Sequence, residues 1–412
     1  MERSLEERDV LILGGGFAGA YVARLLRGRA ATIVSLENFM LYTPLLPEAA
    51  SGTLEPRHTV VPLRVMCPNA QLLLGKVESI DLEAHTATAA GRTIRWRDLV
   101  IALGAVPRTV PVPGLAQHGL AFKSLADAIN LRNHVLQRLE AADGALDEDE
   151  RGRELSFVFV GAGYAGVEAL AELSDLVEDA LRWYPRLRSA RRRWVLVDAA
   201  PRILPEIPPP LGDYAARELA ARGVEIHVGT TLEQATAEEA VLGDGTRIPT
   251  RTLVWTAGVA PNPLLRNWRL PLDDRGRVEV DEFLLVRDEE HVWALGDCAR
   301  VPNTRSEVPD PPTCQHALRQ ARRLAKNLGG EPKPYGYRML GQVATLGRHK
   351  GIAQVLGLRL RGFLGWWVTR TYHLYQLPLA QRKLRVVVDW TVELFFRRDV
   401  VELGQLGHPE GL

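Results

Sequence analysis

Residues 157–168 read Phe-Val-Phe-Val-Gly-Ala-Gly-Tyr-Ala-Gly-Val-Glu, and this stretch decides the fold. The apolar run 157–160 predicts a buried parallel strand, and residues 167–176 predict a helix. Gly161, Gly163 and Gly166 lie between them at the spacing of a dinucleotide-binding loop. The first glycine permits a tight turn, the second lets a pyrophosphate approach the backbone, and the third lets helix and strand pack closely. The helix N-terminus offers unpaired N–H groups to the phosphates.

The same pattern occurs near the N-terminus, where the apolar run 9–13 precedes Gly14, Gly16 and Gly19 and a helix is expected over 20–26. Each loop is followed by a second apolar strand, over 32–36 and 194–197. These strands end at Glu37 and Asp198, acids that can accept hydrogen bonds from a ribose diol. A single loop could be a glycine-rich turn without a ligand. Two loops with two acids predict two bound dinucleotides and electron transfer between them.

Composition sets broader bounds. A chain of 412 residues is too long for one core, so two or three domains are expected. Its 46% hydrophobic and 25% charged residues are typical of a globular protein, and a net charge of +1 does not indicate nucleic-acid binding. Cys67, Cys298 and Cys314 are not at Cys-x-x-Cys spacing, so neither a zinc site nor a dithiol motif is predicted, and the cysteines fit a reducing cytosol.

The polar start of the chain, residues 1–8, does not resemble a signal peptide. No stretch reaches about 18 uninterrupted apolar residues, so we expect no membrane-spanning helix.

Several segments between the motifs have clear patterns. Residues 41–48 contain two prolines, which favour an irregular loop over a helix. Residues 143–154 are dense in charge and read as a solvated surface segment. Short strands are expected at 71–74, 86–89, 98–103, 252–255 and 292–295. A helix is expected from about Thr313 until Gly329-Gly330.

The C-terminal part is basic and aromatic, with eight Arg or Lys against three Asp or Glu over residues 357–400. Amphipathic helices are expected over 362–376 and 384–398. Together with Trp366, Trp367 and Trp390, they suit a membrane surface. Packing onto the globular body or onto a second copy of the chain is the alternative.

These features together resemble the type II NADH dehydrogenases, single-subunit flavoproteins of the two-dinucleotide-binding reductase superfamily. The resemblance covers essentially the whole chain. It is carried by both glycine loops and by five further matching segments: residues 42–48, Glu168, Gly296-Asp297, residues 312–317 and Asp389-Trp390.

The resemblance implies an α/β fold with two Rossmann-like domains, one for FAD and one for NADH, plus C-terminal amphipathic helices. The expected boundaries are 1–125 and 273–335 for the FAD domain, 150–272 for the NADH domain, and 336–412 for a region of membrane and dimer contacts. The implied activity is non-proton-pumping NADH:quinone oxidoreduction in the respiratory chain. Hydride passes from NADH to FAD, and two electrons then pass to a membrane quinone.

Site residues follow from the motifs and the resemblance. The FAD residues are Gly14, Gly16, Phe17, Ala18, Gly19, Glu37, Pro44, Val77, Ala102, Gly104, Asp297, Gln315 and His316. The NADH residues are Gly161, Gly163, Tyr164, Gly166, Glu168, Asp198 and Gly258. The quinone residues are Pro312, Gln315, Ala317 and Arg319. Asp198 would also repel a 2′-phosphate, which favours NADH over NADPH.

Glu168 and Gln315 are the candidate catalytic residues. Glu168 suits nicotinamide positioning or proton movement, although an acid in the first turns of a helix is also favoured by the helix dipole. The family's Ala-Gln-x-Ala-x-Gln motif departs at Cys314 and at Arg319, and Gln320 comes one position late. The quinone assignment therefore rests mainly on Gln315.

Other functions fit less well. A soluble reductase of a ferredoxin-like protein is the runner-up, and a flavin-binding signalling or scaffold protein with little turnover is the alternative from another class. Sulfide:quinone and disulfide reductases need cysteine pairs that are not evident. We expect a homodimer attached peripherally to the cytoplasmic face of the cell membrane.

Overall fold

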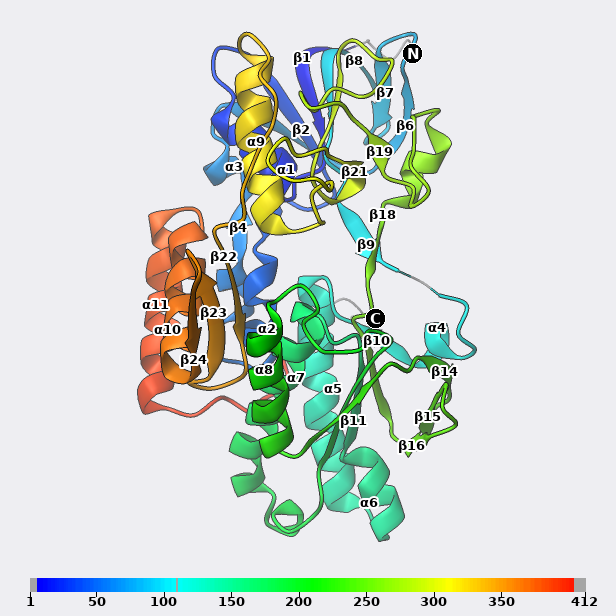
Figure 1. Ribbon diagram of the computed structural model, residues 1–412, viewed down its shortest axis with the longest axis vertical. Helices are drawn as coiled ribbons and strands as arrows, with labels where there is room; N and C mark the ends of the chain where they lie inside the picture. The colour runs from blue at the N-terminus through cyan, green and yellow to red at the C-terminus, as the bar shows by residue number, and fades with distance from the viewer. Residues whose placement is uncertain (1–5, 109, 404–412) are drawn as a thin grey trace, which may run out of the picture. The chain divides into compact units, whose positions relative to one another are not determined.

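The computed structural model describes residues 6–108 and 110–403, and the chain forms two compact units (Figure 1). The first unit takes in residues up to Tyr42, Val60–Val106 and Val259–Met339. The second takes in Thr43–Thr59, Pro107–Gly258 and residues from Leu340 onward.

The first unit is built on a seven-stranded sheet. Its strands are β5 (Ala70–Leu74), β2 (Ala31–Ser35), β1 (Glu6–Leu13), β8 (Arg92–Ile101), β7 (Thr86–Ala89) and β6 (Val77–Asp81) in spatial order, with β20 (Val292–Ala294) also on β8. The central strands β2, β1 and β8 are parallel, whereas β8, β7 and β6 are antiparallel. The last four residues of β1 are fully buried, as expected at the centre of a parallel sheet.

Three helices accompany this sheet: α1 (Phe17–Leu25), α3 (Leu63–Met66) and α9 (Cys314–Leu328). The first and the last pack on each other. Helix α9 therefore runs beside the helix that follows the first glycine loop, although about 300 residues separate them in sequence. Small strand pairs complete the unit: β3 (Phe39–Leu41) with β4 (Val60–Pro62), and β19 (Val278–Glu279) with β21 (Ala299–Arg300).

The second unit has a five-stranded parallel sheet. Its order is β10 (Gly119–Ala121), β17 (Thr252–Trp255), β11 (Ser156–Val160), β12 (Arg193–Asp198) and β13 (Val224–Val228). Helices α5 (Leu125–Gly144), α7 (Tyr164–Ala180) and α8 (Pro209–Ala221) belong to this unit. Valines of β11 and β12 form a core with a small antiparallel sheet of β14 (Leu232–Ala235), β15 (Glu239–Leu242) and β16 (Arg247–Pro249). The α/β class with two Rossmann-like sheets is confirmed.

The units divide the chain differently from the expected boundaries. Residues 107–125 were expected with the first domain, but β10 in this segment pairs with β17 of the second sheet. Residues 259–272 follow β17 and lie in the first unit. The short helix α2 (Leu46–Ala50) belongs to the second unit because it packs on α5 and α7.

One local expectation was wrong. Residues 41–48 are not an irregular loop, because Thr43–Leu45 form a 3₁₀ turn and α2 follows it. Pro47 sits in the first turn of α2, where a missing N–H breaks no helical hydrogen bond.

Residues 143–154 are mostly exposed or partly exposed, as expected of a surface segment, although they also form regular structure. Helix α6 (Glu148–Glu154) begins after the capping side chain of Asp147, and its last residue is buried between Arg138 and Arg251.

The C-terminal region belongs to the second unit. A three-stranded antiparallel sheet, β22 (Gly341–Thr345), β23 (Gly351–Val355) and β24 (Leu358–Arg361), packs against α10 (Gly362–Gln376). Helix α11 (Ala380–Phe395) contacts α10. The apolar stripes of both helices face solvent, while polar residues face the protein: Thr369 and Arg370 of α10 and Glu393 of α11 are buried.

The three tryptophans in this region do not all face outward as expected. Trp367 is exposed, but Trp366 is buried and stacks near the Arg370 guanidinium. Trp390 donates a hydrogen bond to Glu48. Within residues 6–108 and 110–403, none of the helices has the length and apolar character to cross a bilayer.

Candidate functional site: two dinucleotide loops and a capped helix

The first glycine loop depends on close backbone contact. Gly14 ends β1 with φ +114°, a conformation that L side chains rarely adopt. A Cβ on Gly14 would lie 2.2 Å from the carbonyl oxygen of Ala102, and a Cβ on Gly19 would lie 2.0 Å from the carbonyl oxygen of Gly14. These two glycines therefore let β1, the end of β8 and α1 approach one another.

The second loop repeats this geometry in the other unit. Gly161 has φ +115°, and a Cβ there would lie 2.6 Å from the backbone nitrogen of Ala257. A Cβ on Gly166 would lie 1.9 Å from the carbonyl oxygen of Gly161. The first and third glycines of both loops are thus required by the same close backbone contacts.

The middle glycine of each loop is different. Gly16 and Gly163 are the N-caps of α1 and α7, and their backbone is extended, with φ −75° in both. Among the described residues, no atom lies within 4 Å of a Cβ built on either glycine, and no side chain caps either helix. The open space above uncapped N–H groups fits a pyrophosphate. Both loops therefore fit a dinucleotide.

The two strand-end acids stand in different surroundings. Asp198 ends β12, and its carboxylate accepts hydrogen bonds from the backbone N–H of Ala162, at 2.5 Å, and of Ala200, at 2.7 Å. It is therefore directed at the second glycine loop. Glu37 lies two residues beyond β2 and is exposed.

The Gly296-Asp297 turn follows β20 and begins the 3₁₀ turn Gly296–Cys298. Gly296 has φ +75°, and a Cβ there would lie 3.0 Å from the Cβ of Ala18. The turn that contains Asp297 therefore passes Ala18, in the first turn of α1, at Gly296.

Helix α9 presents the other predicted residues of the first unit. Thr313 caps it and contacts His316 twice, through the backbone N–H and through Nδ1 at 2.7 Å. Burial lowers the pKa of His316, while nearby Asp310 opposes the shift. Gln315 follows the cap, and its Oε1 accepts a hydrogen bond from the Tyr337 hydroxyl at 3.4 Å.

Arg319, which departs from the family motif, contacts both Gln315 and Tyr337. Its Nη1 donates to the carbonyl oxygen of Gln315 at 3.2 Å, and its guanidinium lies 4.9 Å from the centre of the Tyr337 ring. Tyr337 was not predicted as a site residue, because nothing in its sequence neighbourhood distinguishes it.

The side chain of Gln320 makes two hydrogen bonds that could not be predicted from the sequence. Its Oε1 accepts from the N–H of Gly296 at 2.8 Å, and its Nε2 donates to buried Asp310 at 2.9 Å. Asp310 also accepts hydrogen bonds from Asn303 and Tyr335. Gln320 thus ties α9 to the Gly296-Asp297 turn.

The remaining predicted residues divide cleanly between the units, with one exception. Every predicted NADH residue lies in the second unit, and every FAD and quinone residue lies in the first except Pro44, which lies in the second. Gly104 and Gly258 both have positive φ, at +65° and +81°, just after β8 and β17. Val77 and Ala317 are buried, and Pro312 precedes α9.

Glu168 is buried on α7, only 8% exposed. Its Oε1 accepts hydrogen bonds from Thr345, from the backbone N–H at 2.8 Å and from Oγ1 at 3.3 Å. Burial raises the pKa of Glu168 to about 8, and the hydrogen bonds from Thr345 oppose the shift. Glu168 therefore carries its proton through much of the neutral range.

Comparisons with known proteins agree with this geometry. Residues 8–321 match the family described as pyridine nucleotide-disulphide oxidoreductase. The chain is 30% identical to a probable NADH dehydrogenase from Dictyostelium discoideum, over 96% of this chain and 91% of that protein. It is also 30% identical to the type II NADH:quinone oxidoreductase Ndh from Mycobacterium tuberculosis, over 94% and 88%.

This chain belongs to the pyridine nucleotide-disulphide oxidoreductase family. Its fold is also that of NDH2 from Plasmodium falciparum, solved in complex with NADH, with a TM-score of 0.89 over 96% of this chain and 99% of that one at 17% identity. Despite the family's description, Cys67, Cys298 and Cys314 are free in the part of the chain that the structure describes.

The open space at Gly16 and Gly163 leads to a prediction about cofactor binding. Gly16→Leu should leave the melting temperature near that of the unaltered protein, because a Cβ there would have no described atom within 4 Å, yet it should lower FAD occupancy at least tenfold. Gly163→Leu is the matched control and should keep its FAD while binding NADH more weakly. Flavin content and NADH titration measure both. Full flavin occupancy in Gly16→Leu would contradict the assignment.

Glu168 yields a prediction about pH. Its folded pKa of about 8 exceeds the ordinary value of 4.5, so the native state binds the extra proton between these values. The stabilisation from this group is complete below about 4.5 and is lost as pH rises through about 8, a change on the order of a few kcal/mol.

Glu168→Gln should therefore lose less stability between pH 5 and 8 than the unaltered protein. Thermal unfolding at several pH values, without NADH, measures this, and exposed Glu233→Gln is the control. Parallel curves for Glu168→Gln and the unaltered protein would show that Glu168 does not titrate in this range.

Proposed function

We propose that the chain is a single-subunit, non-proton-pumping NADH:quinone oxidoreductase that uses FAD. The observation that carries this proposal is the pair of glycine loops, one in each unit, each open where a pyrophosphate needs room. The M. tuberculosis relative, similar along nearly the whole chain, has this activity in its name.

FAD occupies the first unit in this proposal. Gly14, Gly16 and Gly19 form the loop, Glu37 accepts from the ribose, and Asp297 accepts from the ribityl chain. Bound FAD supplies the chemistry of taking a hydride and releasing electrons in turn. The chain's own contribution is orientation, since Gln320 holds the Gly296-Asp297 turn against α9.

NADH occupies the second unit. The loop from Gly161 to Gly166 cradles the pyrophosphate, and Asp198 at the end of β12 receives the ribose. Two backbone N–H groups hold the Asp198 carboxylate in place, so its negative charge would repel the 2′-phosphate of NADPH. This arrangement favours NADH over NADPH.

The quinone lies beside the N-terminus of α9, at Pro312, Gln315, Ala317 and Arg319. The amide of Gln315 supplies hydrogen bonds to the quinone, and its orientation is set by the Tyr337 hydroxyl at Oε1. The Arg319 guanidinium lies against the ring of the same tyrosine and donates to the carbonyl oxygen of Gln315.

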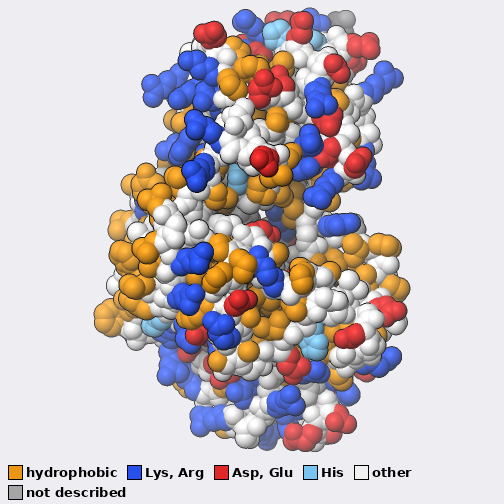
Figure 2. Space-filling model, in the orientation of Figure 1, with side chains coloured by type: hydrophobic (Ala, Val, Ile, Leu, Met, Phe, Trp, Pro, Cys, Tyr) orange, Lys and Arg blue, Asp and Glu red, His pale blue; other side chains and the backbone are white. Residues whose placement is uncertain are grey.

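The C-terminal helices bring the enzyme to a lipid-soluble substrate. Figure 2 shows hydrophobic side chains gathered over α10 and α11. The exposed members include Leu364, Trp367, Tyr375, Leu384, Val388, Leu394 and Phe395. An outward apolar stripe whose polar side is buried suits peripheral binding to a membrane surface, on the cytoplasmic face where NADH is available. The same region carries homodimer contacts.

Two alternatives remain distinguishable by experiment. A reductase of a ferredoxin-like protein would pass electrons to a soluble protein acceptor in the absence of lipid. A flavin-binding signalling or scaffold protein would consume NADH negligibly. Steady-state assays with quinone, with a protein acceptor and with neither separate the three.

Gln315→Ala should slow quinone reduction by about tenfold, the worth of one hydrogen bond, and leave flavin reduction by NADH nearly unchanged. Stopped-flow measurement of the two half-reactions tests this. Exposed Gln117→Ala in the second unit is the matched control. An equal loss in both half-reactions would point to a folding defect and against a quinone role.

The membrane proposal predicts that Trp367→Glu with Phe395→Glu weakens liposome binding by at least roughly 100-fold, since each aromatic side chain buried in the membrane contributes about 1.5–3 kcal/mol. Both side chains are more than half exposed, so folding should be unaffected. Leu146→Glu, at a still more exposed apolar side chain between α5 and α6, is the control. Unchanged liposome binding with a lost dimer would assign this face to a second copy of the chain.

A further inference from the structure

One face of the first unit carries positive charges that no acid balances. It is formed by helices α1 and α9, which pack on each other and contain neither Asp nor Glu. Figure 2 shows Lys and Arg side chains gathered over α9. The exposed or partly exposed cations on this surface, called the basic face below, are Arg24, Arg27, Arg322, Arg323 and Lys326.

Contacts between the two helices bring these cations together. The guanidinium of Arg29, just beyond α1, donates to the carbonyl oxygen of Leu328, the last residue of α9, at 3.2 Å. Burial raises the pKa of Tyr21 on α1, and the positive charges of Arg24 and Arg322 both oppose that shift. Cations of both helices therefore border the same tyrosine and form one surface.

The spacing along α9 connects the basic face to the candidate quinone residue. Arg319, Arg322 and Lys326 follow Gln315 by four, seven and eleven residues, which places all four side chains on one stripe of the helix. Gln315 thus stands at the start of a row of cations.

The cations of the basic face form no ion pair with a carboxylate within residues 6–108 and 110–403. Their neighbour Arg29 differs, because it pairs with Asp9 and, at 2.7 Å, with Asp98. Soluble surfaces ordinarily mix charges of both signs, and a field of one sign attracts partners of the other. The basic face therefore retains its charge for something outside this chain.

Helix geometry accounts for only part of this charge. The dipole of a helix favours cations in its last turn, and Arg24 and Lys326 are placed there. Arg322 and Arg323 lie in the middle of α9, and Arg27 lies beyond the end of α1. These three cations are not required by the helices themselves.

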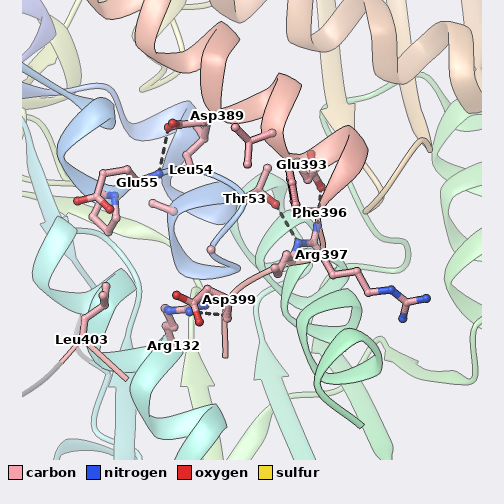
Figure 3. A pocket seen from close by; sticks show the side chains of 15 residues that line it. Thr53, Leu54, Glu55, Arg132, Asp389, Glu393, Phe396, Arg397, Asp399 and Leu403 are labelled. Carbon is pink, nitrogen blue, oxygen red and sulfur yellow. Dashed lines mark hydrogen bonds and ion pairs between the residues drawn. The ribbon is translucent and has the colours of Figure 1, made fainter. Parts of the chain in front are cut away.

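Arginines that line a cavity at the end of α11 in the second unit are, in contrast, compensated (Figure 3). This cavity of about 250 Å³ is lined by Arg132, Arg397 and Arg398 and also by the acids Glu55, Asp389, Glu393 and Asp399. Arg398 pairs with Glu172 at 2.7 Å, and Arg132 donates to the carbonyl oxygen of Asp399 at 2.6 Å. The cavity offers no excess of positive charge, whereas the basic face does.

The side chains between the cations favour lipid headgroups over a protein as the partner. On helices α1 and α9, both described in full, Leu25 is the only large apolar side chain that is exposed, at 38%. The centre of a protein interface usually holds aromatic or aliphatic anchors. Attraction to anionic lipid needs only cations near the bilayer surface.

We propose that the basic face binds the headgroups of anionic lipids. This inference rests on the proposed function for its purpose, because a quinone dissolved in a bilayer must reach Gln315 at the start of the same helix. The contact is distinct from the apolar contact proposed for α10 and α11. It depends on charge, so salt weakens it.

The test uses the full-length protein with its FAD and two kinds of vesicle, one of phosphatidylcholine alone and one that also contains phosphatidylglycerol. The unaltered protein should bind the phosphatidylglycerol vesicles more tightly, and salt should reduce the difference. Arg24→Gln, Arg322→Gln and Lys326→Gln together should lower that affinity on the order of 100-fold at low salt, since each charge contributes about fivefold. Affinity for phosphatidylcholine alone should not change.

The matched control also removes two arginines and one lysine, all exposed in the first unit but outside the basic face: Lys76→Gln, Arg97→Gln and Arg275→Gln. It should keep the preference for phosphatidylglycerol. Arg24→Lys with Arg322→Lys retains the charge and should bind like the unaltered protein. Flavin content and melting temperature show that each variant folds. An equal loss of affinity in both triple variants, or no preference of the unaltered protein for phosphatidylglycerol, would overturn the proposal.

Activity assays separate this proposal from the proposed function. Reduction of a water-soluble quinone without lipid should be the same in the basic-face variant and the unaltered protein, whereas the KM for a long-chain quinone in phosphatidylglycerol vesicles should rise. If the unaltered protein reduced no quinone, the proposed function would fail, while vesicle binding would still decide the lipid contact. Unchanged vesicle binding with a lost reduction of a ferredoxin-like acceptor would assign the face to a protein partner and overturn the proposal.

Discussion

The two glycine loops depend on the contact between the carbonyl oxygen of the first glycine and the helix that follows the loop. In both units, the third glycine of the loop leaves less than 2.1 Å between a hypothetical Cβ and the first glycine's carbonyl oxygen. No other residue allows strand and helix to meet so closely. That contact aims the N-terminus of each helix at the open side of its loop, and the two ligand sites depend on it.

A second constraint acts in the C-terminal region. Helices α10 and α11 differ from ordinary surface helices, because Arg370 and Glu393 are buried while apolar side chains such as Trp367 and Phe395 are exposed. The buried charges are tolerable only because Glu48, Glu172 and Glu393 meet Arg370 and Arg398. The exposed stripe and the buried cluster are therefore one arrangement. An outward apolar surface suits lipid, and the buried glutamate and arginine side chains of this region pair with one another.

Much of this could be predicted from sequence, since the deciding features are local. Glycine spacing and apolar runs located both Rossmann-like sheets, and α10 has the bounds that its periodicity indicated. The features that were not predicted depend on contacts between segments that are far apart in the sequence. Pro44 and α2 lie with the second unit because of packing on α5 and α7, which no local pattern reports. Gln320, Asp310 and Tyr337 acquire roles only when the chain folds, and Glu172 meets Ser51 and Arg398 from two distant segments.

The central claim is that two dinucleotides bind in two units and exchange electrons. Anaerobic titration of the FAD-loaded protein with NADH, followed by addition of a quinone, tests it most directly. The account predicts that about one NADH bleaches one flavin, that the flavin stays bound, and that quinone restores its absorbance. Displacement of FAD by NADH, or a flavin absorbance unchanged by excess NADH, would contradict it.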